Sequence, residues 1–105
     1  MIFKIYQSFE TLGDPCAETV TTAEAAEQVA ARMIEEIAAM IAGNDFMSAP
    51  EDLDEDGLPN RSGRTGSAGE HSAWDAAHDA AGVGRRLTLD AARIVARAAV
   101  VIETT

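Results

Sequence analysis

A short segment in the second half of the chain carries the side chains best suited to binding a transition metal, two histidines and two aspartates. In a helix, His71, Asp75 and His78 are spaced i, i+4 and i+7 and therefore share one face. The HExxH pattern of zinc hydrolases is absent, and no obvious general base accompanies the cluster. A small metal-dependent hydrolase is therefore an alternative function. The simpler interpretation is a surface helix that Trp74 anchors in the core or in an interface.

A second candidate is the acidic run Asp52-Leu53-Asp54-Glu55-Asp56-Gly57, which continues as Leu58-Pro59-Asn60. Ca²⁺ takes six to eight oxygen ligands, and alternate carboxylates followed by a glycine turn can surround one ion. The run resembles the calcium loop of EF-hands, and its continuation is similar to the type 3 repeats of thrombospondin-like proteins. The resemblance implies ligands from Asp52, Asp54, Asp56, Leu58 and Asn60. Gly63 stands where an EF-hand has its bidentate glutamate, so a solvated acidic loop is the simpler interpretation and calcium binding an alternative function.

Nucleophilic catalysis has little support in the sequence. Cys16 is the single cysteine, which rules out an internal disulfide and indicates a reducing compartment. A pairing of Cys16 with either histidine stays open, because such pairs need only be close in space. No nucleophile elbow is present, and the stretch 63–69 lacks the lysine of a phosphate-binding loop. We therefore expect a protein without catalytic activity and without a cofactor.

Charge is distributed very unevenly along the chain. The first sixty residues hold thirteen acidic residues against Lys4 and Arg32, a formal charge of −11, whereas the remainder carries +1. Unpaired carboxylates are costly to bury, so this excess must face solvent or a basic partner. Four arginines, Arg85, Arg86, Arg93 and Arg97, are able to touch phosphate, but a net charge of −10 opposes nucleic-acid binding. We expect them to pair with acids of the first half or of a second subunit.

The elements that position these groups follow from periodicity. Residues 2–10 alternate as a half-buried strand, and 18–21 form a possible second strand of a hairpin. From a capping box at Thr21, an amphipathic helix of about twenty residues extends to a left-handed cap at Gly43. A second helix starts at Ser72 or nearer Gly69 and ends at Gly82 and Gly84. A third is capped by Thr88, and the β-branched residues 100–102 can leave it to pair with the first strand.

These elements predict a single α+β domain over residues 1–105, dominated by its helices, with a small antiparallel sheet and a flexible loop over 44–69. An all-α dimer is the alternative. Because the core is rich in alanine, we expect a homodimer built on the apolar helix stripe through Val29, Met33, Ile37 and Met40. The longest apolar run, 98–102, is too short to cross a bilayer, and no secretory signal is visible. We expect a soluble, cytoplasmic protein.

The leading functional prediction is a binding protein whose acidic surface occupies a basic surface of a partner. Its candidate partner-binding residues follow the first helix and the acidic run after it: Glu24, Glu27, Glu35, Glu36, Glu51, Asp52, Asp54, Glu55 and Asp56. In general character, a short acidic chain of this kind resembles phage-encoded inhibitors of the anti-CRISPR type. The resemblance implies that the protein blocks a CRISPR effector complex, either by mimicking the charge of nucleic acid or by covering its binding site. Acidic antitoxins and small regulatory subunits share the same character.

Overall fold

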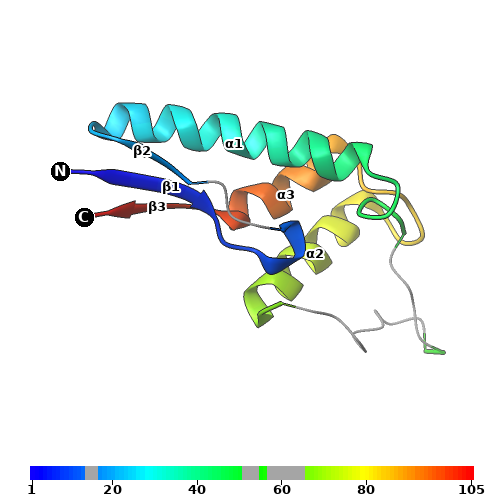
Figure 1. Cartoon of the computed structure of the whole chain (residues 1–105). Coiled ribbons are helices and arrows are strands. Elements are labelled where there is room, and N and C mark those ends of the chain that lie inside the picture. The colour runs from blue at the N-terminus through cyan, green and yellow to red at the C-terminus, as the bar shows by residue number, and fades with distance from the viewer. Residues whose placement is uncertain (14–16, 51–54, 57–65) are drawn as a thin grey trace.

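Three helices and a three-stranded antiparallel sheet make up the computed structural model, which describes residues 1–13, 17–50, 55–56 and 66–105. The predicted α+β class is therefore confirmed, and the all-α alternative is wrong. Figure 1 shows that the long helix α1 runs along the molecule, over the sheet at one end and over α2 and α3 at the other. Among these described residues, no helix has both the length and the apolar character that a membrane crossing requires.

The sheet has the order β2-β1-β3, with β1 (Phe3–Gln7) between β2 (Glu18–Val20) and β3 (Val100–Thr104). Both predicted pairings of the first strand are thus confirmed. Ile5 and Gln7 point toward α1 and are buried, whereas Lys4 on the opposite face is exposed. The alternation of the sequence fixes this orientation, because successive side chains of a strand point to opposite faces.

Helix α1 (Ala23–Gly43) begins and ends differently from the prediction at both termini. Thr22, not Thr21, is the N-cap, and its hydroxyl accepts a hydrogen bond from the backbone N–H of Ala25. At the other end Gly43 is the last helical residue, and Asn44 is the C-cap with φ −99°. The expected left-handed glycine is therefore absent, and the Asn44 side chain instead accepts hydrogen bonds from the next turn.

Helix α2 (Ala68–Ala81) uses the earlier of the two predicted starts. Its capping box is formed by Ser67 and Glu70, upstream of the alternative start at Ser72, and this places His71 inside the helix. The helix ends at Gly82, where φ is +100°, as the sequence indicated. The helical segment therefore takes in the last residues of the predicted 44–69 loop, and residues 45–48 of that loop form a turn.

Helix α3 (Leu89–Ala99) is capped by Thr88 as predicted and lies between α1 and α2. Its buried side is almost entirely alanine, and Ala92, Ala96 and Ala99 are fully inaccessible to solvent. Such small side chains allow the three helices to approach closely. The main core is therefore filled mostly by alanine side chains between closely spaced helix backbones, and only to a small extent by aromatic side chains. A second, smaller core joins α1 to the sheet through Ile5, Ala26, Ala30 and Met33.

This packing corrects the predicted dimer surface on α1. Met33 is buried inside the chain, and Val29 and Ile37 are half-buried against the same two cores. Met40 is the one exposed member of the stripe. The alanine-rich composition suggests too little apolar surface within one chain to cover this stripe. The sheet and α3 supply that surface, so a homodimer would need a different face.

Candidate partner-binding surface

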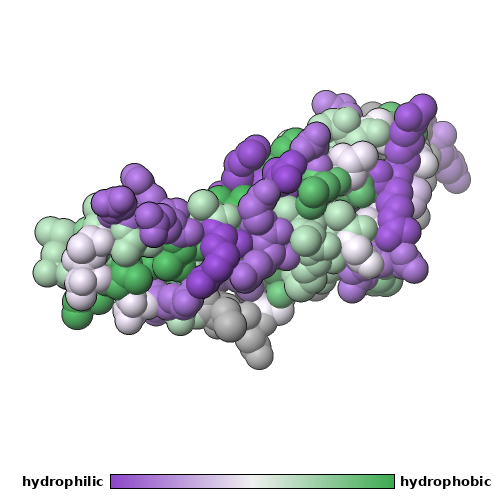
Figure 2. All heavy atoms as spheres, turned by 90° about the horizontal axis from the view of Figure 1, so that it is seen from above, coloured by the Kyte–Doolittle hydropathy of each residue, from purple (hydrophilic) through white to green (hydrophobic). Residues whose placement is uncertain are grey.

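The outer side of α1 carries charged side chains from Glu24 to Glu36, whereas its last turns expose Ala39 and Met40. Its four predicted glutamates, Glu24, Glu27, Glu35 and Glu36, are all exposed, because the helical period turns Ala26, Ala30, Met33, Ala38 and Ile41 inward. Figure 2 shows the molecule from this side, with rows of hydrophilic side chains separated by apolar surface. The sequence therefore predicted correctly that these four carboxylates face solvent.

Near the sheet, Arg32 neutralises part of this surface. Its guanidinium pairs with Glu18 of β2, and its Nε lies 3.7 Å from the carboxylate of Glu36 one turn further along α1. All three side chains are well exposed, so each pair contributes little to stability. The arrangement nevertheless leaves Glu36 beside a cation rather than available as an isolated negative charge.

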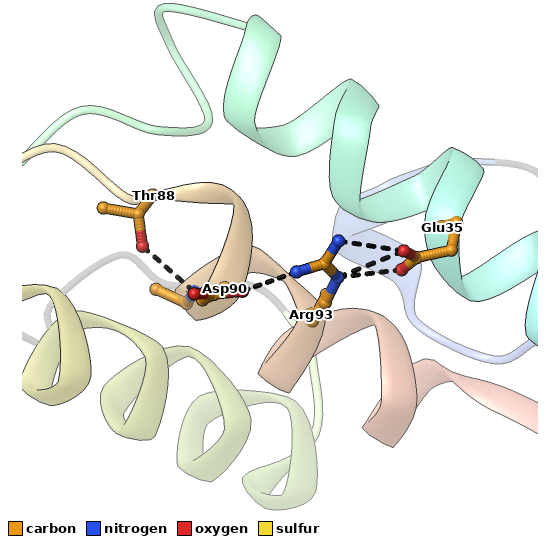
Figure 3. A network of polar contacts seen from close by, with 5 residues as sticks. Glu35, Thr88, Asp90 and Arg93 are labelled. Carbon is orange, nitrogen blue, oxygen red and sulfur yellow. Dashed lines mark hydrogen bonds and ion pairs between the residues drawn. The ribbon is translucent and has the colours of Figure 1, made fainter.

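In the middle of α1, Glu35 is held by Arg93 of α3. Two guanidinium nitrogens of Arg93 donate to the Glu35 carboxylate, at distances between 2.9 and 3.2 Å, and a third donates to Asp90 (Figure 3). Hydrogen bonding from Arg93 lowers the pKa of Glu35, and the same contact raises the pKa of Arg93. The Arg93 side chain is only 26% exposed, which marks this contact as the best-shielded ion pair of the described surface.

An open depression of about 680 Å³ lies between α1 and α3 around this pair. Its apolar part comes from Ala31, Ile34 and Ile94, and its charged part from Glu35, Asp90, Arg93 and Arg97. Two acids and two arginines line it, so the depression has no net charge. Arg97 approaches Glu35 closely enough to lower the pKa of that carboxyl, but it forms no ion pair with the described residues.

The predicted pairing of the second-half arginines is confirmed for two of them. Arg93 holds Glu35, and Arg86 lies 2.6 Å from the carboxylate of Asp45 while it also donates to the Ala42 carbonyl. Arg93 thus connects α3 to α1, and Arg86 connects the segment before α3 to the turn that follows α1. Arg86 and Arg93 therefore hold parts of the fold together, which agrees with their interpretation as structural rather than phosphate-binding groups.

Glu24 and Glu27 are the members of the acidic surface that have no ion pair within the described residues. Both lie in the first two turns of α1, beside the sheet. The positive end of the helix dipole partly offsets the charge of Glu24, because Glu24 stands in the first turn. Within α1, the glutamates without an ion pair among the described residues are therefore those of its N-terminal part.

The acidic run after α1 is described only in part. Glu55 and Asp56 are exposed in a turn. The other predicted partner-binding residues of this run, Glu51, Asp52 and Asp54, lie outside the described residues, and so does most of the predicted calcium loop. Cys16, the candidate nucleophile, also lies outside them.

The histidine cluster is placed on α2, as expected from a helical spacing. Trp74 packs against the main core, its ring centroid lies 6.5 Å from that of His78, and its indole N–H donates to the hydroxyl of Thr11. Within the described parts of the chain, no three His, Cys, Asp or Glu side chains are arranged to hold a metal ion. The predicted anchoring of Trp74 in the core is confirmed.

Glu70 is the ionisable residue that the sequence analysis overlooked. Its side chain is 2% exposed and accepts hydrogen bonds from the backbone N–H of Ser67 and from both the N–H and the hydroxyl of Thr11. Burial raises the pKa of Glu70, but the hydrogen bonds outweigh it and the net pKa is lowered. The spacing Ser67-x-x-Glu70 is itself a capping-box signal, so the sequence contained the clue.

Neither a protein family, nor a curated protein, nor a solved structure matches the chain.

Proposed function

We propose that this protein is a non-catalytic binding protein whose acidic α1 surface occupies a basic surface of a protein partner. The supporting observation is that Glu24 and Glu27 are exposed on a rigid helix and lack an ion pair within the described residues. A partner's arginine or lysine can satisfy them with charge-assisted hydrogen bonds. Glu35 lies on the same side of α1 as Glu24, and both Glu35 and Glu36 already have arginine neighbours.

The geometry of α1 suits such a contact. At a rise of 1.5 Å per residue, Glu24 and Glu35 are separated by roughly 16 Å along the helix axis. This length matches about five base steps of one nucleic-acid strand. A basic groove that normally follows a phosphate backbone is therefore a partner surface of the right size. Packing of α1 on the sheet and on α3 keeps the helix rigid, which lowers the entropic cost of binding.

The resemblance to anti-CRISPR proteins gives this proposal its most specific version, in which the basic surface belongs to a subunit of a CRISPR effector complex. The protein would then compete with nucleic acid for that subunit and would not itself contact nucleic acid. A purified effector complex and a fluorescent target DNA test this version. Increasing amounts of the protein should release the DNA, and unchanged DNA binding would reject it.

The broader proposal is tested with matched charge-reversal variants. Glu24→Lys with Glu27→Lys changes the net charge by the same amount as Glu10→Lys with Asp79→Lys, whose side chains are exposed away from α1. Proteins captured from the native host are identified by mass spectrometry, and their affinities are then measured at low and high salt. We expect the α1 variant to lose binding and the control to retain it. An equal loss in both would point to overall charge and contradict an α1 site.

A further inference from the structure

Strand β3 stands at an edge of the sheet and is poorly protected. It begins with three β-branched apolar residues, Val100, Val101 and Ile102, and it contains neither proline nor lysine. In the described part of the chain no strand pairs with its outer side. Natural proteins usually guard such edges with charges, prolines, bulges or a covering segment, because an unguarded edge pairs with another strand.

The hydrogen bonds at both ends of the β1–β3 ladder show which backbone groups point outward. Ser8 N–H donates to the Ala99 carbonyl at 2.8 Å, and Thr105 N–H donates to the Ile2 carbonyl at 2.9 Å. Hydrogen-bonded and non-bonded positions alternate in an antiparallel pair, so Val101 and Glu103 also bond inward. The N–H and C=O groups of Ile102 and Thr104 therefore face the open side.

Val100 differs from these two residues because its N–H is already used. It donates to the Ala96 carbonyl as the C-cap of α3, so only the Val100 carbonyl remains available at the edge. A strand added along β3 can therefore accept hydrogen bonds from the N–H groups of Ile102 and Thr104. It can donate to the C=O groups of Val100, Ile102 and Thr104.

Ile102 adds an apolar side chain to this edge. It pairs with Ile5, which is fully buried under α1, yet Ile102 itself remains 41% exposed. The neighbouring Glu103 lies on the opposite face, where its carboxylate accepts a 2.8 Å hydrogen bond from the Tyr6 hydroxyl. The side of the edge nearest α1 therefore carries Val100, Ile102 and Thr104 and no charged side chain, and Glu103, the charged residue of β3, lies on the other face.

The opposite edge of the sheet is better protected. Strand β2 has only three residues, and its Glu18 is engaged by Arg32 of α1. Charge and shortness both discourage pairing. Of the two edges, β3 is the one open to a further strand.

We propose that β3 pairs antiparallel with β3 of a second copy of this chain, about a two-fold axis at Ile102. Outward-facing residues must oppose one another, which restricts the axis to Val101, Ile102 or Glu103. An axis at Glu103 sets two like charges directly opposite, which is unfavourable. An axis at Val101 leaves the Thr104 groups unpaired, because they would then meet the end of α3.

The axis at Ile102 avoids both problems. The two copies of Ile102 exchange reciprocal N–H···O=C bonds, and each Thr104 N–H donates to the Val100 carbonyl of the other copy. Glu103 then lies opposite Val101, and the two half-exposed Ile102 side chains meet at the seam beneath α1. In this register the outward donors and acceptors of β3 match those of a second β3, and no like charges oppose one another. We therefore assign the open edge to a second copy of this chain rather than to an unrelated strand.

A two-fold axis perpendicular to the sheet keeps both α1 helices on the same side of a six-stranded sheet. Three strand spacings separate the two copies of β1, so the α1 axes lie roughly 14 Å apart. That is wider than the 8–10 Å of packed helices, so the contact is made mainly by the strands. The area is below that of a standard interface, and we expect a concentration-dependent dimer.

Salt separates this inference from the proposed function, on which it does not depend. Each copy carries a net charge of −10, so the two copies repel one another at low ionic strength. Screening should strengthen self-association as salt rises, whereas a contact between an acidic surface and a basic partner should weaken. The two associations therefore respond to salt in opposite directions.

Sedimentation equilibrium of the full chain, from about 5 to 500 μM at low and high salt, tests the dimer. We expect a dimer that tightens with salt and is lost in Ile102→Lys, because two lysines would then stand opposite each other. The matched control Thr19→Lys, at the β2 edge, should still dimerise. A monomer at every concentration, or a dimer that survives Ile102→Lys, overturns the proposal.

Cross-linking supplies a second test if Ile102→Lys does not fold. In a Cys16→Ser background, Ile102→Cys should form a disulfide between copies on mild oxidation, since directly paired Cα atoms lie about 5.5 Å apart. Lys4→Cys, on the outer face of the central strand, is the control and should remain monomeric. Equal cross-linking of the two variants would overturn the proposal.

Discussion

Glu70→Ala should be among the most damaging substitutions of a charged residue in this protein. The Glu70 carboxylate connects the start of α2 to the short helix η1 (Glu10–Leu12), because it accepts hydrogen bonds from Ser67 and Thr11. The Thr11 hydroxyl in turn accepts the indole N–H of Trp74 at 3.1 Å. Removing the carboxylate therefore leaves three donors without their acceptor: the N–H of Ser67 and the N–H and hydroxyl of Thr11. The Thr11 hydroxyl is also the group that orients Trp74.

The size of the effect follows from how well each donor can regain water. Hydrogen bonds to charged groups contribute about 1.5–3 kcal/mol each, and an unsatisfied buried donor costs a similar amount. Ser67 is exposed and its N–H can be rehydrated, but Thr11 is half-buried. We therefore expect a loss of about 2–4 kcal/mol in the free energy of unfolding, a large part of a typical domain's stability.

Glu70 should also make stability depend on pH. Its pKa is lower in the folded chain than in the unfolded chain, so the unfolded state binds the proton more readily. The stabilisation is complete above the unfolded pKa of about 4.3 and is lost as the pH falls through the lower folded value. Glu70→Gln should therefore flatten the decline in stability below about pH 5.

Urea unfolding of the wild type, Glu70→Ala and Glu70→Gln across this pH range measures both effects. Glu27→Ala, an exposed glutamate of α1, is the control and should change stability by no more than about 0.5 kcal/mol. A double-mutant cycle with Thr11→Val should give a coupling energy of about 0.5–3 kcal/mol. If Glu70→Ala costs no more than the control, the hydrogen-bond network does not stabilise the fold and the reasoning is refuted.

Three further outcomes are expected. Gly66→Ala should destabilise by about 1–3 kcal/mol in thermal unfolding, because φ is +96° there and a Cβ would lie 2.5 Å from the Glu70 carboxylate; no change would contradict the backbone geometry. Ala96→Leu should cost about 1–3 kcal/mol by overpacking α3, whereas Ala98→Leu on its exposed side should be nearly neutral, and equal effects would be inconsistent with the helix orientation. Calorimetry should find weak Ca²⁺ binding or none, and a dissociation constant of about 10 μM or tighter that Asp54→Ala abolishes would instead support the calcium alternative.

The sequence by itself determined the elements whose signals are local. Alternation predicted β1, the helical period predicted which side of α1 faces solvent, and Thr88 and Gly82 marked helix ends. Such signals depend on a few neighbouring residues and on backbone geometry, so they can be read from the sequence without knowledge of the fold. The earlier start of α2 was readable in the same way from Ser67 and Glu70.

Only the tertiary structure decided which charges remain available and which apolar residues are used. The sequence presented Glu24 and Glu35 as equivalent exposed acids, but Arg93, fifty-eight residues away, holds Glu35 and leaves Glu24 free of such a partner among the described residues. Likewise, the sequence left Met33 available to a second subunit, but the sheet covers it in the fold. Contacts between residues so far apart in the sequence depend on how whole helices and strands pack, and no local sequence pattern predicts them.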